Sequence, residues 1–117
     1  MAKGVFLAFS NAANDQVHEE YNEWYDNVHM KEVLALPGVI SARRFKLANA
    51  QIMPGDDAGG RNYLALYEVE VENWEDLARV QQQGFANGNI TINTDLLQLD
   101  PMVQTMVFEE ITAETRG

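Results

Sequence analysis

The chain has 117 residues, a length typical of one globular domain, which buries roughly two thirds of its unfolded surface. Its net charge of −10, from 8 Lys and Arg against 18 Asp and Glu, excludes the basic surface that nucleic-acid binding requires. The absence of cysteine excludes disulfides and thiolate chemistry. We therefore expect one cytoplasmic domain over residues 1–117, with its core at 4–112.

The first apolar run, at 5–9, predicts a strand because it is continuous and ends at the turn-forming residues Ser10 and Asn11. It is much shorter than the roughly 20 apolar residues of a membrane-spanning helix, so we expect no membrane contact. A helix follows, with Asn14 or Asp15 as its N-cap. Its buried face is predicted from apolar residues at three- and four-residue steps, namely Val17, Tyr21, Trp24 and Val28.

Residues 39–47 predict a second strand after a Pro-Gly turn. Strict alternation places Arg43 on the more apolar face, together with Val39 and Phe45. Arg44 then falls on the other face. An arginine on an apolar face usually has an anion nearby, which here is either a substrate carboxylate or enolate, or an acidic side chain of the protein.

The remaining chain supplies two more strands and one more helix. A Gly-, Pro- and Asp-rich loop is expected at 49–60, followed by a strand at 62–71 that carries Tyr63 and Tyr67 on one face. Asn73 caps a second helix, which Gly84 ends or kinks. The pattern is weak from there to residue 100, and 102–111 reads as the last strand. The order β-α-β-β-α-β predicts an α+β, ferredoxin-like fold.

The predicted sheet carries apolar residues on both faces, whereas the helices of such a fold cover only one. Val103 and Val107 alternate with Met102, Met106 and Phe108 in the last strand, for example. The uncovered face therefore needs a partner, and two sheets packed face to face would bury it. We expect a homodimer through this sheet face.

The segment 24–29, Trp-Tyr-Asp-Asn-Val-His, is the most suggestive chemically. Together with Val33-Leu34, Pro37-Gly38-Val39 and Ala42-Arg43-Arg44-Phe45, it resembles the EthD-like branch of the dimeric α+β barrel superfamily, over roughly residues 4–112. This superfamily includes cofactor-free monooxygenases, polyketide cyclases, muconolactone isomerases and haem-degrading enzymes. Lys31 stands where family members often have proline, so we expect the helix to continue past His29.

His29 and Tyr25 are the candidate catalytic residues. They lie four residues apart, so their side chains share one shoulder of the helix. A histidine there can act as general acid or base, and a tyrosine can donate a hydrogen bond to a developing oxyanion. The simpler alternative is a histidine at the core edge, bonded to backbone. Candidate substrate-binding residues are Arg43, Tyr21, Tyr63, Tyr67 and Trp24, although Trp24 and Tyr21 are also expected to pack in the core.

No cofactor or metal is expected. The haem-degrading relatives use a histidine near the second helix, and this chain has none beyond His29. His18 and His29 would lie about 16 Å apart along a helix, too far to share an ion. A site built from His29, Asp26 and Glu32 is conceivable but unspecific.

Two function classes follow from these residues and the resemblance. The first is a cofactor-independent isomerase, cyclase, lyase or monooxygenase that uses His29 for proton transfer at carbon on a small aromatic or cyclic oxygenated substrate. The second is a non-catalytic dimeric module that binds a small ligand or is associated with stress. A pocket bordering His29 would favour the enzyme, and a solid core would favour the module.

Overall fold

Four strands form one antiparallel sheet in the computed structural model, which describes residues 1–53, 55 and 58–117. They are β1 (Ala2–Ser10), β2 (Val39–Lys46), β3 (Tyr63–Val71) and β4 (Gln104–Glu109). Their order across the sheet is β2-β3-β1-β4, and each neighbouring pair is antiparallel. The predicted hairpin loop joins β2 to β3, but its residues Pro54, Asp56 and Asp57 lie outside the described part.

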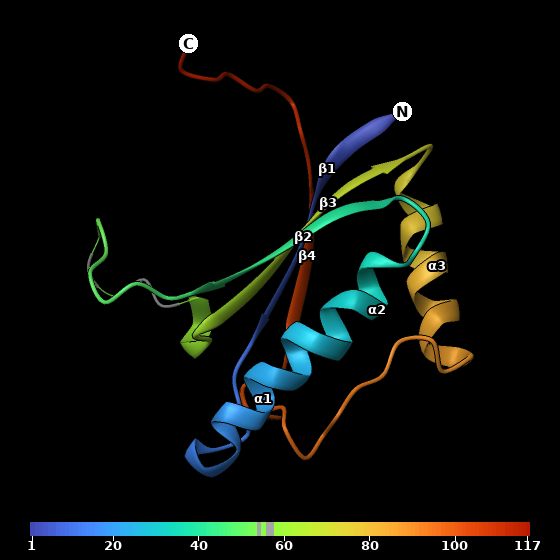
Figure 1. Ribbon diagram of the computed structural model, residues 1–117. Coiled ribbons are helices and arrows are strands. Elements are labelled where there is room, and N and C mark those ends of the chain that lie inside the picture. The colour runs from blue at the N-terminus through green and yellow to red at the C-terminus, as the bar shows by residue number, and fades with distance from the viewer. Residues whose placement is uncertain (54, 56–57) are drawn as a thin grey trace.

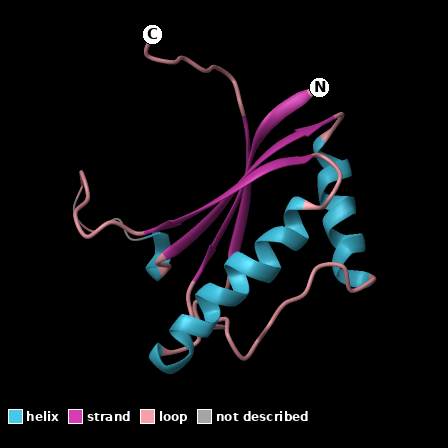
Figure 2. Ribbon diagram, viewed as in Figure 1, coloured by secondary structure: helices cyan, strands magenta, loops and turns pink. Residues whose placement is uncertain are grey.

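The helices lie on one side of this sheet (Figures 1 and 2). The consecutive helical elements over residues 15–34, which we call the rod, lead from β1 to β2, and α3 leads from β3 towards β4. The predicted order β-α-β-β-α-β is therefore confirmed, and with it the ferredoxin-like α+β fold. In chain order the helical elements are η1 (Asp15–Val17), α1 (His18–Trp24), η2 (Tyr25–His29), α2 (Met30–Leu34), the short turn η3 (Ala58–Gly60) and α3 (Trp74–Ala86).

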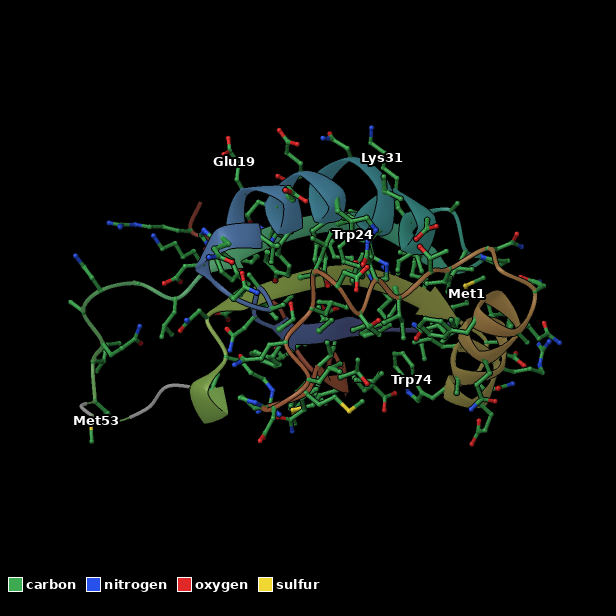
Figure 3. All side chains as sticks on the ribbon, turned by 90° about the horizontal axis from the view of Figure 1, so that it is seen from below. Met1, Glu19, Trp24, Lys31, Met53 and Trp74 are labelled. Atoms are coloured by element: carbon green, nitrogen blue, oxygen red, sulfur yellow. The ribbon has the colours of Figure 1, made fainter. Side chains whose placement is uncertain are left out.

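The rod begins at Asn14, whose side chain accepts a hydrogen bond from the backbone N–H of Val17. It continues through Lys31 to Leu34, as expected in the absence of a proline. Glu19 and Lys31 point away from the body of the protein, whereas Trp24 lies on the inner side (Figure 3). Asn73 caps α3 in the same way as Asn14, by accepting from the N–H of Asp76.

The prediction that Val28 belongs to the core is wrong, because η2 is a π-helical turn rather than an α-helical one. An α-helix has about 3.6 residues per turn, so side chains spaced four residues apart move gradually round its axis. The wider π turn has more residues per turn and so brings side chains spaced four apart back onto one face. Tyr21, Tyr25 and Val33 are buried on that face with His29 between them, and Val28 remains 44% exposed.

Arg43 shares a face of β2 with Phe45, as the alternation predicts, but Val39 does not lie on that face. The pairing between β2 and β3 shifts by one residue between Val39 and Ser41, as in a β-bulge, so the inward-outward alternation changes phase there. Ala42 and Arg44 consequently face the helices, and Arg43 faces the opposite side of the sheet. The sequence left open which face of β2 meets the helices, and a bulge carries no plain sequence signal, so the grouping of Val39 with Arg43 and Phe45 is wrong.

The core fills the space between the helices and the sheet. Phe6 and Ala8 of β1 face Tyr67 and Ala65 of β3, and Leu77 of α3 is buried beside them. Burying a large apolar side chain of this kind contributes roughly 1.5–3 kcal/mol to folding. Phe6, Ala8 and Tyr67 also line a cavity on this side of the sheet.

Residues 87–99, which we call the strap, connect α3 to the turn before β4. Figure 1 shows this segment in orange, passing alongside the rod. Gly84 does not end α3, because the helix continues to Ala86. Its lack of a side chain is needed for packing, since a Cβ there would lie 2.6 Å from the Cδ1 atom of Ile90 in the strap.

The other face of the sheet is uncovered by the helices and carries an apolar patch. Met106 and Phe108 of β4 are 40% and 49% exposed, and they pair with Leu7 and Val5 of β1. Phe45 of β2 is 41% exposed on the same side. Within the described residues, no helix combines the length and the apolar composition that crossing a membrane requires.

Candidate functional site

A cavity of about 160 Å³ lies between the rod, α3, the strap and the sheet. Its lining is mostly apolar, with Phe6, Val33 and Ile90 among the contributors. The polar residues that reach it are Tyr25, His29, Tyr67, Gln81 and Thr105. A dry apolar cavity of about 150 Å³ is large enough to bind benzene, so this space accommodates a molecule built on a single ring.

His29 borders the cavity at the end of η2. Its ring stacks on Trp24 with centroids 4.7 Å apart and meets the edge of Tyr25 at 5.0 Å. The side chain is 13% exposed, and this burial lowers the pKa of His29, although the nearby Glu32 charge opposes the shift. The imidazole is therefore neutral near pH 7 and can accept a proton.

The contact between His29 Nδ1 and Glu32 Oε1 measures 3.5 Å, which is longer than a good hydrogen bond. Nδ1 is buried and has no hydrogen-bond partner among the residues that the structure describes. Such long contacts often shorten only when a substrate is bound. The carboxylate is thus placed to orient the ring and to stabilise its protonated form.

Tyr25 and Tyr67 supply the other polar groups of the cavity. Burial raises the pKa of Tyr67 to about 12, and burial together with the neighbouring tyrosines raises the pKa of Tyr25 well above its usual value. Both phenols therefore remain protonated and can donate hydrogen bonds. The Tyr25 and Tyr67 phenols lie close enough to affect each other's pKa, but the buried Tyr67 hydroxyl meets no partner with hydrogen-bond geometry in the described part of the chain. It is therefore available to a ligand oxygen.

A second aromatic group lies further along the rod towards α1. There the Tyr21 and Ser10 hydroxyl oxygens lie 2.6 Å apart in a buried hydrogen bond, and the Tyr63 hydroxyl is bonded to Nε2 of His18. The sequence left open which face of β3 carries Tyr63 and Tyr67, and both face the helices. Only Tyr67 of the two reaches the cavity.

Arg44 links the two groups, and the sequence reasoning missed it. Its Cζ atom lies 4.4 Å from the Tyr25 ring centroid and 5.4 Å from that of Tyr21, distances typical of cation–π contacts. Its Nη1 donates to Asp26 Oδ1 at 2.8 Å. Nε and Nη2 are buried without partners in the described residues. Recognising it from sequence would have required knowing that its face of β2, and not the face of Phe45, meets the helices.

Three other residues predicted at the site, Arg43, Trp24 and Asp26, do not line the cavity. Arg43 lies on the opposite face of the sheet, where its guanidinium is 5.4 Å from the Phe45 ring, so it does not meet His29 within one chain. Trp24 packs against His29 rather than lining the cavity. Asp26 is paired with Arg44 and not with His29 and Glu32. Among the described residues, no cluster of three or more potential ligands is arranged to hold a metal ion.

Two solved structures are similar to the chain along almost its whole length. The first is a protein of the ethyl tert-butyl ether D (EthD) family from Bacillus halodurans C-125, with a TM-score of 0.60 and 14% sequence identity, covering 95% of this chain and 100% of that one. The second is HapK from Hahella chejuensis, with a TM-score of 0.52 and 10% identity, covering 97% and 98%. At these identities the likeness concerns the fold, which is therefore EthD-like.

No curated protein matches the chain. A family model described as a domain of unknown function, DUF4286, matches residues 9–87, which include β1 from Phe9, the rod, β2, β3 and α3. The match thus takes in His29, Tyr25, Tyr67 and Arg44. The chain belongs to this DUF4286 family and has the EthD-like α+β fold.

Proposed function

We propose that the protein is a cofactor-independent enzyme that transfers a proton at carbon on a small, uncharged aromatic or cyclic oxygenated substrate. The observation that carries this proposal is the partly enclosed apolar cavity bordered by a neutral histidine and two protonated tyrosines. The EthD-like resemblance supports it, because that superfamily includes isomerases, cyclases and monooxygenases that work without cofactors.

In the proposed reaction, His29 takes a proton from a carbon next to a carbonyl group. The electrons of the broken C–H bond move onto the carbonyl oxygen, and a hydrogen bond from Tyr67 or Tyr25 stabilises the enolate that forms. Return of the proton from His29 to another carbon completes an isomerisation. If the enolate instead expels a leaving group from the adjacent carbon, that group takes the proton from His29 and the result is an elimination. If the enolate carbon attacks a second carbonyl, the alkoxide that forms takes the proton and the result is a cyclisation.

The small cavity and its apolar lining restrict the substrate class. The lining includes no Lys or Arg, so no positive charge in it would compensate for the desolvation of a carboxylate already charged on binding. Single-ring cyclic ketones and lactones are therefore preferred as substrates over aromatic acids, and phenols are preferred over aromatic acids as ligands.

A thermal-shift screen of these four compound classes tests the proposal. We expect neutral single-ring compounds to raise the melting temperature of the wild type and of His18→Ala, but not of His29→Ala. Compounds selected in this way are then assayed for turnover. If no compound shifts the wild type, or if His29→Ala responds equally, the proposal fails.

The alternative is a non-catalytic module that binds the same ligand. The preponderance of apolar groups in the cavity favours it, because apolar contacts supply affinity without chemistry. Binding by the wild type with no conversion of any bound compound would support this alternative.

We further propose that the uncovered sheet face pairs with the same face of a second copy. Val5, Leu7, Leu66 and Phe108 provide a continuous apolar surface across β1, β3 and β4. Light scattering should give twice the chain mass of 13.2 kDa. Leu66→Lys should shift the protein to monomers, since a buried lysine at such an interface lacks a partner. A monomeric wild type at micromolar concentration would contradict the dimer.

A further inference from the structure

The strap closes one side of the cavity and is fixed firmly at its two ends. Its Ile90 N–H donates to the Gly84 carbonyl at 3.0 Å, which attaches it to α3. At the other end, the Leu96 carbonyl accepts from the Ala13 N–H at 2.8 Å. Ile90 and Leu97 are buried and line the cavity from these two ends. The strap therefore forms one wall of the cavity, and these two hydrogen bonds do not attach its central residues, 91–95, to the rest of the protein.

Thr91 provides that attachment, through Glu32 of α2. The Thr91 N–H donates to Glu32 Oε1 at 3.2 Å, and its hydroxyl lies 3.0 Å and 3.2 Å from Oε1 and Oε2. The Thr91 backbone also lies close enough to His29 to raise the pKa of the imidazole. Within the described residues, the side-chain carboxylate of Glu32 makes all the other hydrogen bonds between residues 91–95 of the strap and the rest of the protein.

The same carboxylate contacts His29. Its Oε1 atom lies 3.5 Å from His29 Nδ1, and the Glu32 side chain is only 19% exposed. Glu32 and His29 are three residues apart, one turn along the rod, so the helix itself fixes this spacing. The other titratable groups lining the cavity are Tyr25 and Tyr67. Glu32 is therefore the acidic group that joins the histidine to the strap.

We propose that Glu32 is a positioning residue, which both orients the His29 ring and keeps the strap closed over the cavity through Thr91. This inference rests on the proposed function, since it assigns a regulator of access to the same cavity. Release of Thr91 from Glu32 would free the centre of the strap while its two ends stay attached, which opens a path for the substrate. The closed strap excludes water from His29.

Four variants separate the two roles in the ligand-free protein. Glu32→Ala removes both contacts, and Thr91→Val removes the side-chain contact with the strap while keeping the charge beside His29. Glu32→Gln keeps an oxygen that can accept from Thr91 but removes the charge. Glu23→Gln is the matched control, because Glu23 is an exposed glutamate of α1.

Hydrogen exchange of the strap amides is the first readout. We expect exchange to be about tenfold faster in Glu32→Ala and Thr91→Val, as fits the loss of hydrogen bonds to a charged group, and to return to near the wild-type rate in Glu32→Gln. Amides of β1 and β3 report whether the fold is intact. Unchanged strap exchange in both Glu32→Ala and Thr91→Val would overturn the proposal.

The pKa of His29, followed by NMR of its ring, is the second readout. Glu32→Gln should lower this pKa, because the neighbouring negative charge favours the protonated ring. Glu23→Gln should leave it unchanged. A pKa that stays the same or rises in Glu32→Gln would refute the orienting role. Neither readout requires a ligand, so failure here is distinct from failure of the compound screen.

Discussion

The two aromatic groups beneath the rod contain the same residue types in different chemical states. Near α1, the hydroxyls of Tyr21 and Tyr63 are satisfied by Ser10 and His18. Near η2, the Tyr67 hydroxyl and His29 Nδ1 have no partner among the described residues, and a cavity lies beside them. A histidine close to tyrosines is therefore not a site in itself. Open space does not distinguish the two groups either, since a wider hollow of about 640 Å³ borders His18 and Tyr63. The unsatisfied polar atoms beside an apolar cavity distinguish the candidate site from a structural network.

Loss of each histidine should have very different effects on catalysis. His29→Ala should lower the turnover of a substrate found in the compound screen by about 100-fold or more, the range for loss of a general acid or base. His18→Ala should change it by no more than a few-fold, because His18 does not line the cavity. Steady-state kinetics measure both. Equal losses in the two variants would remove the distinction between the groups.

For stability the order of the two groups should be reversed: loss of the Tyr21 hydroxyl near α1 should matter more than loss of the Tyr67 hydroxyl near η2. Tyr21→Phe leaves the buried Ser10 hydroxyl without its partner and should cost about 1–3 kcal/mol in the free energy of unfolding. Tyr67→Phe removes a hydroxyl that is already unpartnered, so the change should stay within about 0.5 kcal/mol of zero. Urea unfolding compares the two. A larger loss in Tyr67→Phe would mean that its hydroxyl is bonded in the free protein.

The smallest expected effect is on the pH dependence of stability. The pKa of His29 is lower in the folded state than in the unfolded state, where it is about 6.5. Protonation of His29 therefore does not affect the free energy of unfolding well above pH 6.5, and it lowers this free energy as the pH falls below 6.5. The advantage of the wild type over His29→Gln in unfolding free energy should therefore shrink between pH 7 and pH 5. His18→Gln serves as control, since it keeps His29. A growing advantage would mean that the folded state favours the charged ring.

Much of the fold was predictable from sequence because its signals are local. Asn14 and Asn73 cap helices as their side chains predict, and the apolar runs mark all four strands. The adjacency of Tyr25 and His29 also followed from their spacing, although their roles stay predictions. These features depend on backbone periodicity, which a single sequence carries.

The features that could not be predicted arise from departures from that periodicity or from distant contacts. The bulge at the start of β2 puts Val39 on the inner face with Arg44 rather than on the outer face with Arg43, and the π turn exposes Val28. The contact between Glu32 and Thr91 joins residues 59 positions apart, in a segment whose sequence has no clear pattern. The bulge, the π turn and this contact are all set by tertiary packing, so local sequence propensity does not predict them.

The most direct test of the central claim uses the fact that the chain has two histidines, one in each aromatic group. Protein labelled with ¹⁵N only in histidine gives ring signals for His18 and His29, which the His18→Gln variant assigns. A neutral single-ring compound selected by thermal shift is then titrated in. We predict that the ring signals of His29 move while those of His18 stay in place. Movement of the His18 signals with those of His29 unchanged would contradict the account.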